Sequence, residues 1–237
     1  MIRNLIRKVI HKIDYHLASP TDKSVWSVVD ILEYEYALRR SMDERVPVDK
    51  AGEPLPWYTY PAIDYINQLD FSDKCVYEFG SGNSSLFWSR ISKEVVSVEH
   101  DEKWYSSRVD HLKPNLVLKH RTGKNYCASI LEEGGEFDVI VVDGIFRDCC
   151  CEHLQKKLKR NGLVILDNSD RASEFEEYSR AVSVLKAAGL IQVDFSGFGP
   201  VNAFTWITSF FFTRAFDFRS KSHPLQPAKT LGNIFEK

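Results

Sequence analysis

VYEFGSGNSSLFW, residues 76–88, is the stretch of sequence that decides the fold of this chain. It opens with an apolar run interrupted by Glu78, and this run predicts a buried strand that ends at Phe79. A glycine turn and a helix start follow, formed by Gly80, Ser81, Gly82 and a cap at Asn83 or Ser84. Glycine lets the backbone approach a ligand closely, and the free N–H groups at a helix start can donate to that ligand. The stretch therefore predicts a strand–loop–helix unit with a ligand beside the turn.

Short apolar runs alternate with helical stretches from Lys74 onward. The runs are rich in β-branched residues and cover residues 75–79, 94–98, 116–118, 137–142 and 162–167. Helices are predicted between them, near residues 84–91, 101–112, 147–159 and 171–188. This alternation predicts a doubly wound α/β fold with a parallel sheet. The last two runs, 191–195 and 203–214, are joined by the turn-rich GFGPVN without a helix, so we expect them to be antiparallel.

The N-terminal region has a different pattern. Residues 1–17 predict an amphipathic helix whose apolar face is formed by Ile2, Leu5, Ile6, Val9, Ile10 and Ile13. Four Lys or Arg less one Asp give this segment a charge of +3, so we expect its apolar face to contact a second subunit or an anionic membrane surface, or else its own domain. A second helix is predicted from Pro20 to about Arg40. A proline-rich loop over 46–61 then leads into a short helix near Pro61.

Composition excludes several classes of protein. The chain has 237 residues, 43% of them hydrophobic, and no run approaches the roughly 20 apolar residues of a membrane-spanning helix. Lys and Arg total 31 against 33 Asp and Glu, so no basic field favours nucleic acid. Five cysteines, three of them consecutive at 149–151, suit neither a disulfide framework nor a zinc site. A soluble cytoplasmic protein is expected, with the Cys149–Cys151 run serving as small buried side chains rather than reactive thiolates.

Acidic residues end two further predicted strands. Glu99 follows the glycine turn by about twenty residues, where an acid commonly binds nucleotide ribose, and Asp143 ends the fourth strand. The spacing alone also suits nicotinamide dinucleotides, but GSGNSS lacks the third glycine of their GxGxxG loop. Glu78 would repel a pyrophosphate and attract the cationic end of a methionine-like ligand.

EFGSGNSS followed by VVSVEHDEKWY resembles motif I and the next acidic strand end of class I S-adenosylmethionine-dependent methyltransferases. The resemblance covers residues 74–214 and implies a mostly parallel seven-stranded, Rossmann-like sheet that ends in an antiparallel hairpin. VVDGIFRDCC and GLVILDNSDR are similar to a bacterial subgroup that modifies small molecules or glycans. An oxygen acceptor on a sugar or another small molecule is expected first. A nitrogen acceptor stays open, although the NPPY-type tetrapeptide of amino-methylating DNA enzymes is absent. The implied organisation is a helical extension over the cofactor cleft (1–70), a cofactor-binding domain (71–218) and a tail (219–237).

The family pattern also implies roles for individual residues. Gly80 and Gly82 would shape the pocket, Glu78 would lie beside the methionine moiety, and Glu99 would bind the ribose. The implied cofactor set is Glu78, Gly80, Ser81, Gly82, Asn83, Glu99, His100 beside the adenine, and Asp143. The contact to the adenine amino group stays open among Lys124, Asn125 and Tyr126, and Asp101 is predicted to cap the next helix.

Asp143, Asp167 and Asn168 follow two strands expected to be neighbours. This arrangement resembles the Mg²⁺ site of catechol-type O-methyltransferases, although Phe146 stands where those enzymes have a lysine. Alternatively, residues 167–170 only cap a helix, and Asp143 or Asp167 accepts the proton of the acceptor hydroxyl. Arg147 is predicted either to clamp an anionic substrate or to pair with Asp143 or Asp148.

Three other functions remain open from the sequence: an aminopropyltransferase, an NAD-dependent enzyme, and a module that binds S-adenosylmethionine or a nucleotide without catalysis. Six aromatic residues are expected in the core or in a lid: Trp57, Tyr58, Tyr60, Phe198, Phe204 and Trp206. Those in the proline-rich loop and in GFGPVN are expected to reach the pocket mouth, because connecting loops at the carboxyl edge of a sheet determine substrate choice.

Overall fold

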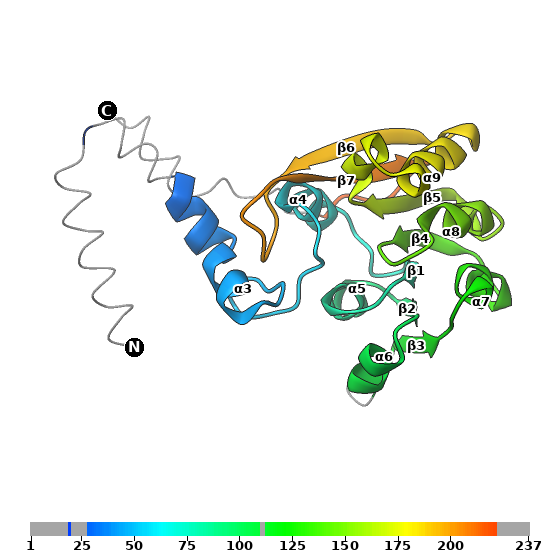
Figure 1. The fold of residues 1–237 in the computed structure, drawn as a ribbon, viewed down its shortest axis with the longest axis horizontal. Helices are drawn as coiled ribbons and strands as arrows, with labels where there is room; N and C mark the ends of the chain where they lie inside the picture. The colour runs from blue at the N-terminus through cyan, green and yellow to red at the C-terminus, as the bar shows by residue number, and fades with distance from the viewer. Residues whose placement is uncertain (1–18, 20–27, 110–111, 222–237) are drawn as a thin grey trace.

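The computed structural model describes residue 19 and residues 28–109 and 112–221, and its centre is a seven-stranded sheet. The strand order is β3-β2-β1-β4-β5-β7-β6 (Figure 1). The strands are β1 (Cys75–Phe79), β2 (Glu94–Glu99), β3 (Leu116–His120), β4 (Phe137–Val142), β5 (Leu158–Asp167), β6 (Ile191–Gly197) and β7 (Trp206–Phe212). The first five are parallel, and β7 lies antiparallel between β5 and β6. The predicted fold class, including the terminal hairpin, is confirmed.

Helices cover both faces of the sheet because strand residues alternate between two apolar cores. In β1, Val76 packs in one core and Tyr77 and Phe79 in the other. The first core includes α4 (Tyr60–Gln68) and α5 (Asn83–Ile91), and the second includes α7 (Lys124–Ala128), α8 (Arg147–Leu154) and α9 (Glu176–Ala187). The short helices α6 (Glu102–Arg108), η3 (Ser129–Glu132) and η4 (Ser169–Ser173) complete the described connections between strands.

Two helix predictions in the sheet domain need correction, and two short helices were missed. α7 and η3 were not predicted, because segments this short give no helical periodicity. The helix predicted over 147–159 ends at Leu154, since Leu158 already pairs with Phe137 of β4 and lengthens β5. The helix predicted over 171–188 is divided into η4 and α9.

The N-terminal segment is anchored to the sheet domain. Its described part consists of a π-helix, η1 (Ile31–Glu35), and α3 (Leu38–Glu44), so the continuous helix predicted to Arg40 is broken at Ala37, whose φ is 54°. The Tyr36 hydroxyl at the break donates to Asp64 of α4 at 2.7 Å. Residues from Leu55 to Leu69, assigned by the sequence to the extension, share the first core with the strands.

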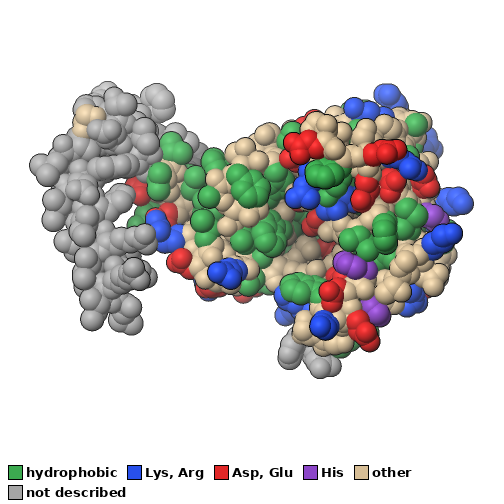
Figure 2. All heavy atoms as spheres, in the orientation of Figure 1, with side chains coloured by type: hydrophobic (Ala, Val, Ile, Leu, Met, Phe, Trp, Pro, Cys, Tyr) green, Lys and Arg blue, Asp and Glu red, His purple; other side chains and the backbone are tan. Residues whose placement is uncertain are grey.

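The helix predicted over residues 1–17 lies outside the described residues. No helix in the described part is long and apolar enough to cross a membrane. Acidic and basic side chains are interspersed on the face shown in Figure 2, in agreement with a net charge of only -2.

Candidate active site

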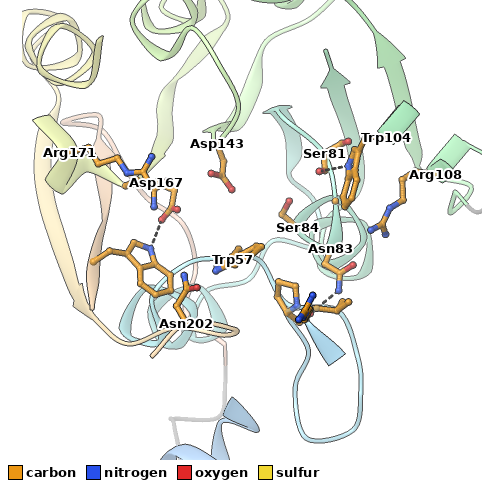
Figure 3. A pocket seen from close by; sticks show the side chains of 16 residues that line it. Trp57, Ser81, Asn83, Ser84, Trp104, Arg108, Asp143, Asp167, Arg171 and Asn202 are labelled. Carbon is orange, nitrogen blue, oxygen red and sulfur yellow. Dashed lines mark hydrogen bonds between the residues drawn. The ribbon is translucent and has the colours of Figure 1, made fainter. Parts of the chain in front are cut away.

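A cavity of about 380 Å³ lies at the carboxyl ends of β1, β4 and β5. The glycine turn and the start of α5 form one side of it, and the ends of β5 and β7 form the opposite side (Figure 3). Residues 45–47 and Trp57 come from the N-terminal segment to line it as well. The Asn83 amide donates to the Pro47 carbonyl at 2.8 Å, and this bond ties the N-terminal segment to the start of α5.

The two glycines of the turn have different roles. Gly80 has a φ of 110°, and a Cβ there would lie 3.0 Å from the Asp143 carbonyl oxygen, so glycine is required for the turn to pack against the end of β4. A Cβ at Gly82 would meet only the Trp104 ring, at 3.8 Å, and would otherwise project into open space. Gly82 therefore keeps the entrance to the α5 N-terminus free for a ligand.

Glu78 lies beneath the turn and is 0% exposed. Its Oε2 accepts hydrogen bonds from the Ser97 hydroxyl, at 2.8 Å, and from the Ser85 hydroxyl. Its Oε1 has no hydrogen-bond partner among the described residues, and burial raises the pKa of this carboxyl to about 7. A buried acceptor without a partner, next to a glycine turn, fits a ligand that brings a cationic donor.

Glu99 ends β2 as predicted, and local donors hold its carboxylate. Oε1 accepts from the backbone N–H groups of His100 and Asp101 at 2.8 and 2.9 Å, and Oε2 accepts from the Ser81 hydroxyl at 2.8 Å. The Trp104 indole donates to the Ser81 carbonyl at 3.1 Å. Glu99 is not among the residues that line the cavity, whereas Ser81, which donates to it, and Trp104 are. Its contact with a ribose stays a prediction.

The roles of the residues around Glu99 were only partly predicted from the sequence. Asp101 accepts the Trp104 N–H at 2.9 Å and caps α6, which confirms its predicted role. His100 places Nδ1 3.0 Å from Glu99 Oε1 and its ring 5.9 Å from that of Tyr126. Tyr126 is fully buried, and a Cβ on Gly144 would collide with its hydroxyl.

Asp143 and Asp167 both line the cavity, from the ends of β4 and β5. Asp167 Oδ1 accepts from the Trp206 indole at 3.1 Å and from the Thr208 hydroxyl at 2.5 Å. Burial, together with the charge of Asp143, raises the pKa of Asp167 well above that of an ordinary Asp. Burial also raises the pKa of Asp143, against the opposing charges of Arg147 and Arg171. The structure thus brings together the two predicted catalytic carboxyls, each with its affinity for a proton increased.

The predicted Mg²⁺ ligands do not fit a metal ion. Arg147 is 8% exposed, and its Nη2 lies 3.4 Å from both Asp143 Oδ1 and Asn168 Oδ1. This guanidinium occupies the space between two of the three expected ligands, and its fixed charge would repel a cation there. No group of three or more His, Cys, Asp or Glu in the described part of the chain could hold a metal. The structure therefore gives no support to the predicted Mg²⁺ site, and the predicted pairing of Arg147 with Asp143 is confirmed.

Several lining residues were not expected from the sequence: Arg45, Trp104, Arg108, Arg171 and Asn202. They are far apart in the chain, so no local motif could have grouped them. Of the aromatics expected at the pocket mouth, Trp57 lines the cavity, Tyr58 and Tyr60 are buried in the first core, and Phe198 is not a lining residue. Trp206, at the start of β7, also lines the cavity.

Comparisons with known proteins support the fold. No protein-family model and no curated protein sequence matches the chain. A precorrin-6y C5,15-methyltransferase from Geobacter metallireducens superposes with a TM-score of 0.55 and 14% identity, over 73% of this chain and 96% of that one. An O-methyltransferase from Bacillus cereus in complex with SAH gives a TM-score of 0.54 and 14% identity, over 76% and 98%. Spermidine synthase from Thermotoga maritima gives 0.50 and 16%, over 67% and 63%. The chain therefore has the Rossmann-like fold of class I S-adenosylmethionine-dependent methyltransferases.

Proposed function

We propose that this protein is an S-adenosylmethionine-dependent methyltransferase that methylates a hydroxyl group of a sugar or another small molecule. The proposal rests on one observation, the presence in a single cavity of an open glycine turn and two carboxyls at the ends of β4 and β5, the partly exposed Asp143 and the buried Asp167. The turn suits the cofactor. The carboxyls suit an acceptor whose hydroxyl must lose a proton.

The residues around the glycine turn fit the cofactor. An ammonium group at the methionine end would give Glu78 Oε1 the donor that it lacks and would favour the ionised carboxylate. Glu99 would bind the ribose hydroxyls after the Trp104 ring, which is 42% exposed, moves away from Ser81. When bound, the cofactor supplies an electrophilic methyl group on a sulfonium.

We assign the role of proton acceptor to Asp167. The bonds from Trp206 and Thr208 both go to Oδ1, so they fix the carboxyl and leave Oδ2 for the acceptor hydroxyl. The raised pKa makes Asp167 a stronger base than an exposed Asp. The Oδ1 atom of Asp143 already faces the Arg147 guanidinium. In this assignment Asp143 does not accept the proton, and its charge contributes to the electrostatic field around the acceptor.

Calorimetry with S-adenosylhomocysteine, decarboxylated S-adenosylmethionine and NADH tests the cofactor. We expect S-adenosylhomocysteine to bind most tightly, and preference for either other ligand would contradict the proposal in favour of aminopropyl transfer or a dinucleotide-dependent reaction. Transfer of labelled methyl groups to a panel of sugars and cell metabolites tests catalysis. Binding of S-adenosylhomocysteine with no transfer to any acceptor would indicate a non-catalytic module.

Asp167→Asn tests the base. It should keep the affinity for S-adenosylhomocysteine and lower turnover by about 100-fold or more, as expected when general-base catalysis is removed. Asp143→Asn is the comparison. A larger loss of turnover in Asp143→Asn than in Asp167→Asn would move the role to Asp143.

A further inference from the structure

Three arginines that line the cavity have no ion-pair partner in the described part of the chain. Arg45, Arg108 and Arg171 form no ion pair with any described carboxylate. Other arginines are paired: Arg90 with Glu53, Arg121 with Glu132 and Arg180 with Asp148. With Asp143 and Asp167 both ionised, the three arginines still leave the lining with a net positive charge, although the whole chain carries -2. Such a lining favours an anionic ligand.

These arginines belong to different parts of the cavity. Arg108 lies beside Trp104 on the side of the glycine turn, with its guanidinium 4.4 Å from the centre of the indole ring. Arg171 lies on the opposite side with Asp167, and Figure 3 shows Trp57 between the two sides. The cofactor occupies the first side in the proposed function, so Arg171 is left facing the acceptor.

Arg171 is held in place by Tyr178 and forms no ion pair with Asp143, although its charge opposes the rise in the pKa of that carboxyl. Its Nη1 donates to the Tyr178 hydroxyl at 3.4 Å, and its guanidinium lies 5.8 Å from the centre of the same ring. This contact orients the side chain and leaves the other N–H groups of the guanidinium fork for a ligand. Asn202 lines the cavity as well, and Trp57 is 41% exposed and offers a flat surface against which a ring can stack.

We propose that the methyl acceptor carries a carboxylate or phosphate group and that Arg171 binds this group. The inference rests on the proposed function, because the side of Arg171 is the acceptor side only if the cofactor occupies the glycine-turn side. A planar fork of donors matches both oxyanions, and each charge-assisted contact favours the acid over its neutral analogue. Trp57 would meanwhile contact the ring of the acceptor.

Titration calorimetry of the protein saturated with S-adenosylhomocysteine tests this inference. The probes are matched pairs of acid and neutral analogue: glucuronate and glucose, glucose 6-phosphate and glucose, benzoate and benzamide. We expect the acid of at least one pair to bind tenfold or more tightly than its neutral analogue. Glucuronate and glucose 6-phosphate distinguish a carboxylate from a phosphate on the same sugar.

Arg171→Ala should remove this preference. Arg160→Ala is the matched control, because Arg160 is also exposed and unpaired but lies near the start of β5, away from the cavity. Both variants lose one positive charge, so a general charge effect would appear equally in both. No preference for any acid, or an equal preference in wild type and Arg171→Ala, would overturn the inference and leave the proposed function standing as long as S-adenosylhomocysteine binds. Failure of S-adenosylhomocysteine to bind would overturn both.

Discussion

Glu78, the next-to-last residue of β1, and Glu99, the last residue of the neighbouring β2, lie below the same glycine turn, yet their surroundings differ. Glu99 accepts two backbone N–H bonds and a hydroxyl bond, so its carboxylate is well stabilised. Glu78 accepts two hydroxyl bonds on one oxygen and none on the other, in full burial. The unfavourable ionisation of Glu78 in the free protein is what a cationic ligand could relieve.

Glu78 should make the stability of the free protein depend on pH. Its pKa in the fold is about 7, raised by burial from an ordinary 4.5, so the folded state binds this proton more tightly than the unfolded state. The associated stability is present below pH 4.5 and is lost as the pH rises to about 7, a loss on the order of 3 kcal/mol. Urea unfolding at pH 5 and pH 8 should show a smaller decrease for Glu78→Gln than for wild type. An equal decrease in both proteins would contradict this prediction.

Glu99 should contribute to cofactor affinity. Glu99→Gln keeps the shape of the side chain but removes its charge, so we expect binding of S-adenosylhomocysteine to weaken by about 10- to 100-fold, typical for loss of a charged hydrogen bond. Glu94→Gln, at the exposed start of the same strand, is the control and should bind as wild type does. Unchanged calorimetric affinity in Glu99→Gln would remove Glu99 from the cofactor site.

Arg147 leads to a prediction about metal. Because its guanidinium lies between Asp143 and Asn168, Mg²⁺ should not bind there. Thermal unfolding of the protein should therefore be unchanged by millimolar MgCl₂ or by EDTA, since a bound ion would raise the unfolding temperature. Stabilisation by Mg²⁺ that disappears in Asp167→Asn would restore the metal site.

Among the elements, the strands were predicted best. β1 and β4 begin and end where the apolar runs 75–79 and 137–142 do, because both strands are covered on both faces. Helix limits were predicted less well where tertiary contacts decide them. The break at Ala37 accompanies the anchoring of Tyr36 to α4, and the early end of α8 accompanies the pairing of Leu158 with Phe137. Neither contact has a local signal in the sequence.

The cysteines of α8 should be unreactive in the folded protein. Cys150 and Cys151 are fully buried, and burial raises the pKa of both thiols. Burial also raises the pKa of the partly exposed Cys149, to about 12. Iodoacetamide at neutral pH should leave these three thiols unmodified until urea unfolds the chain, as peptide mass mapping can determine. Rapid labelling of Cys150 or Cys151 in the native protein would contradict their structural role.

At the scale of the whole molecule, the sequence could place only those site residues that follow strands. Asp143 and Asp167 were predicted to meet because carboxyl ends of neighbouring parallel strands lie at one edge of a sheet. The sequence offered pairing of Arg147 with Asp143 as one alternative, but it could not predict that the guanidinium also approaches Asn168, because side-chain packing decides that contact. Arg45 and Trp57 line the cavity from the N-terminal segment, which the hydrogen bond from Asn83 to Pro47 ties to the start of α5, and no local signal in the sequence shows this long-range contact.

The last prediction concerns residues 1–17, which lie outside the described residues and carry +3 on a chain of -2. From the sequence we expect their apolar face to be buried against a second subunit or an anionic membrane surface, with packing on the same domain as the alternative. Deletion of residues 1–17 should lower the solution mass to that of a monomer in the first case. In the second case it should abolish co-sedimentation with anionic liposomes, because each basic residue lost removes about 1 kcal/mol of the free energy of membrane binding.

Two controls separate these cases. Neutral liposomes should not bind the full chain if lipid charge attracts the segment, and Ile6→Asp with Ile10→Asp should mimic the deletion if the apolar face makes the contact. Packing on the same domain would instead appear as a lower unfolding free energy with mass and liposome binding unchanged. If the truncated protein keeps its mass, its liposome binding and its stability, the segment has no such partner and the prediction is wrong.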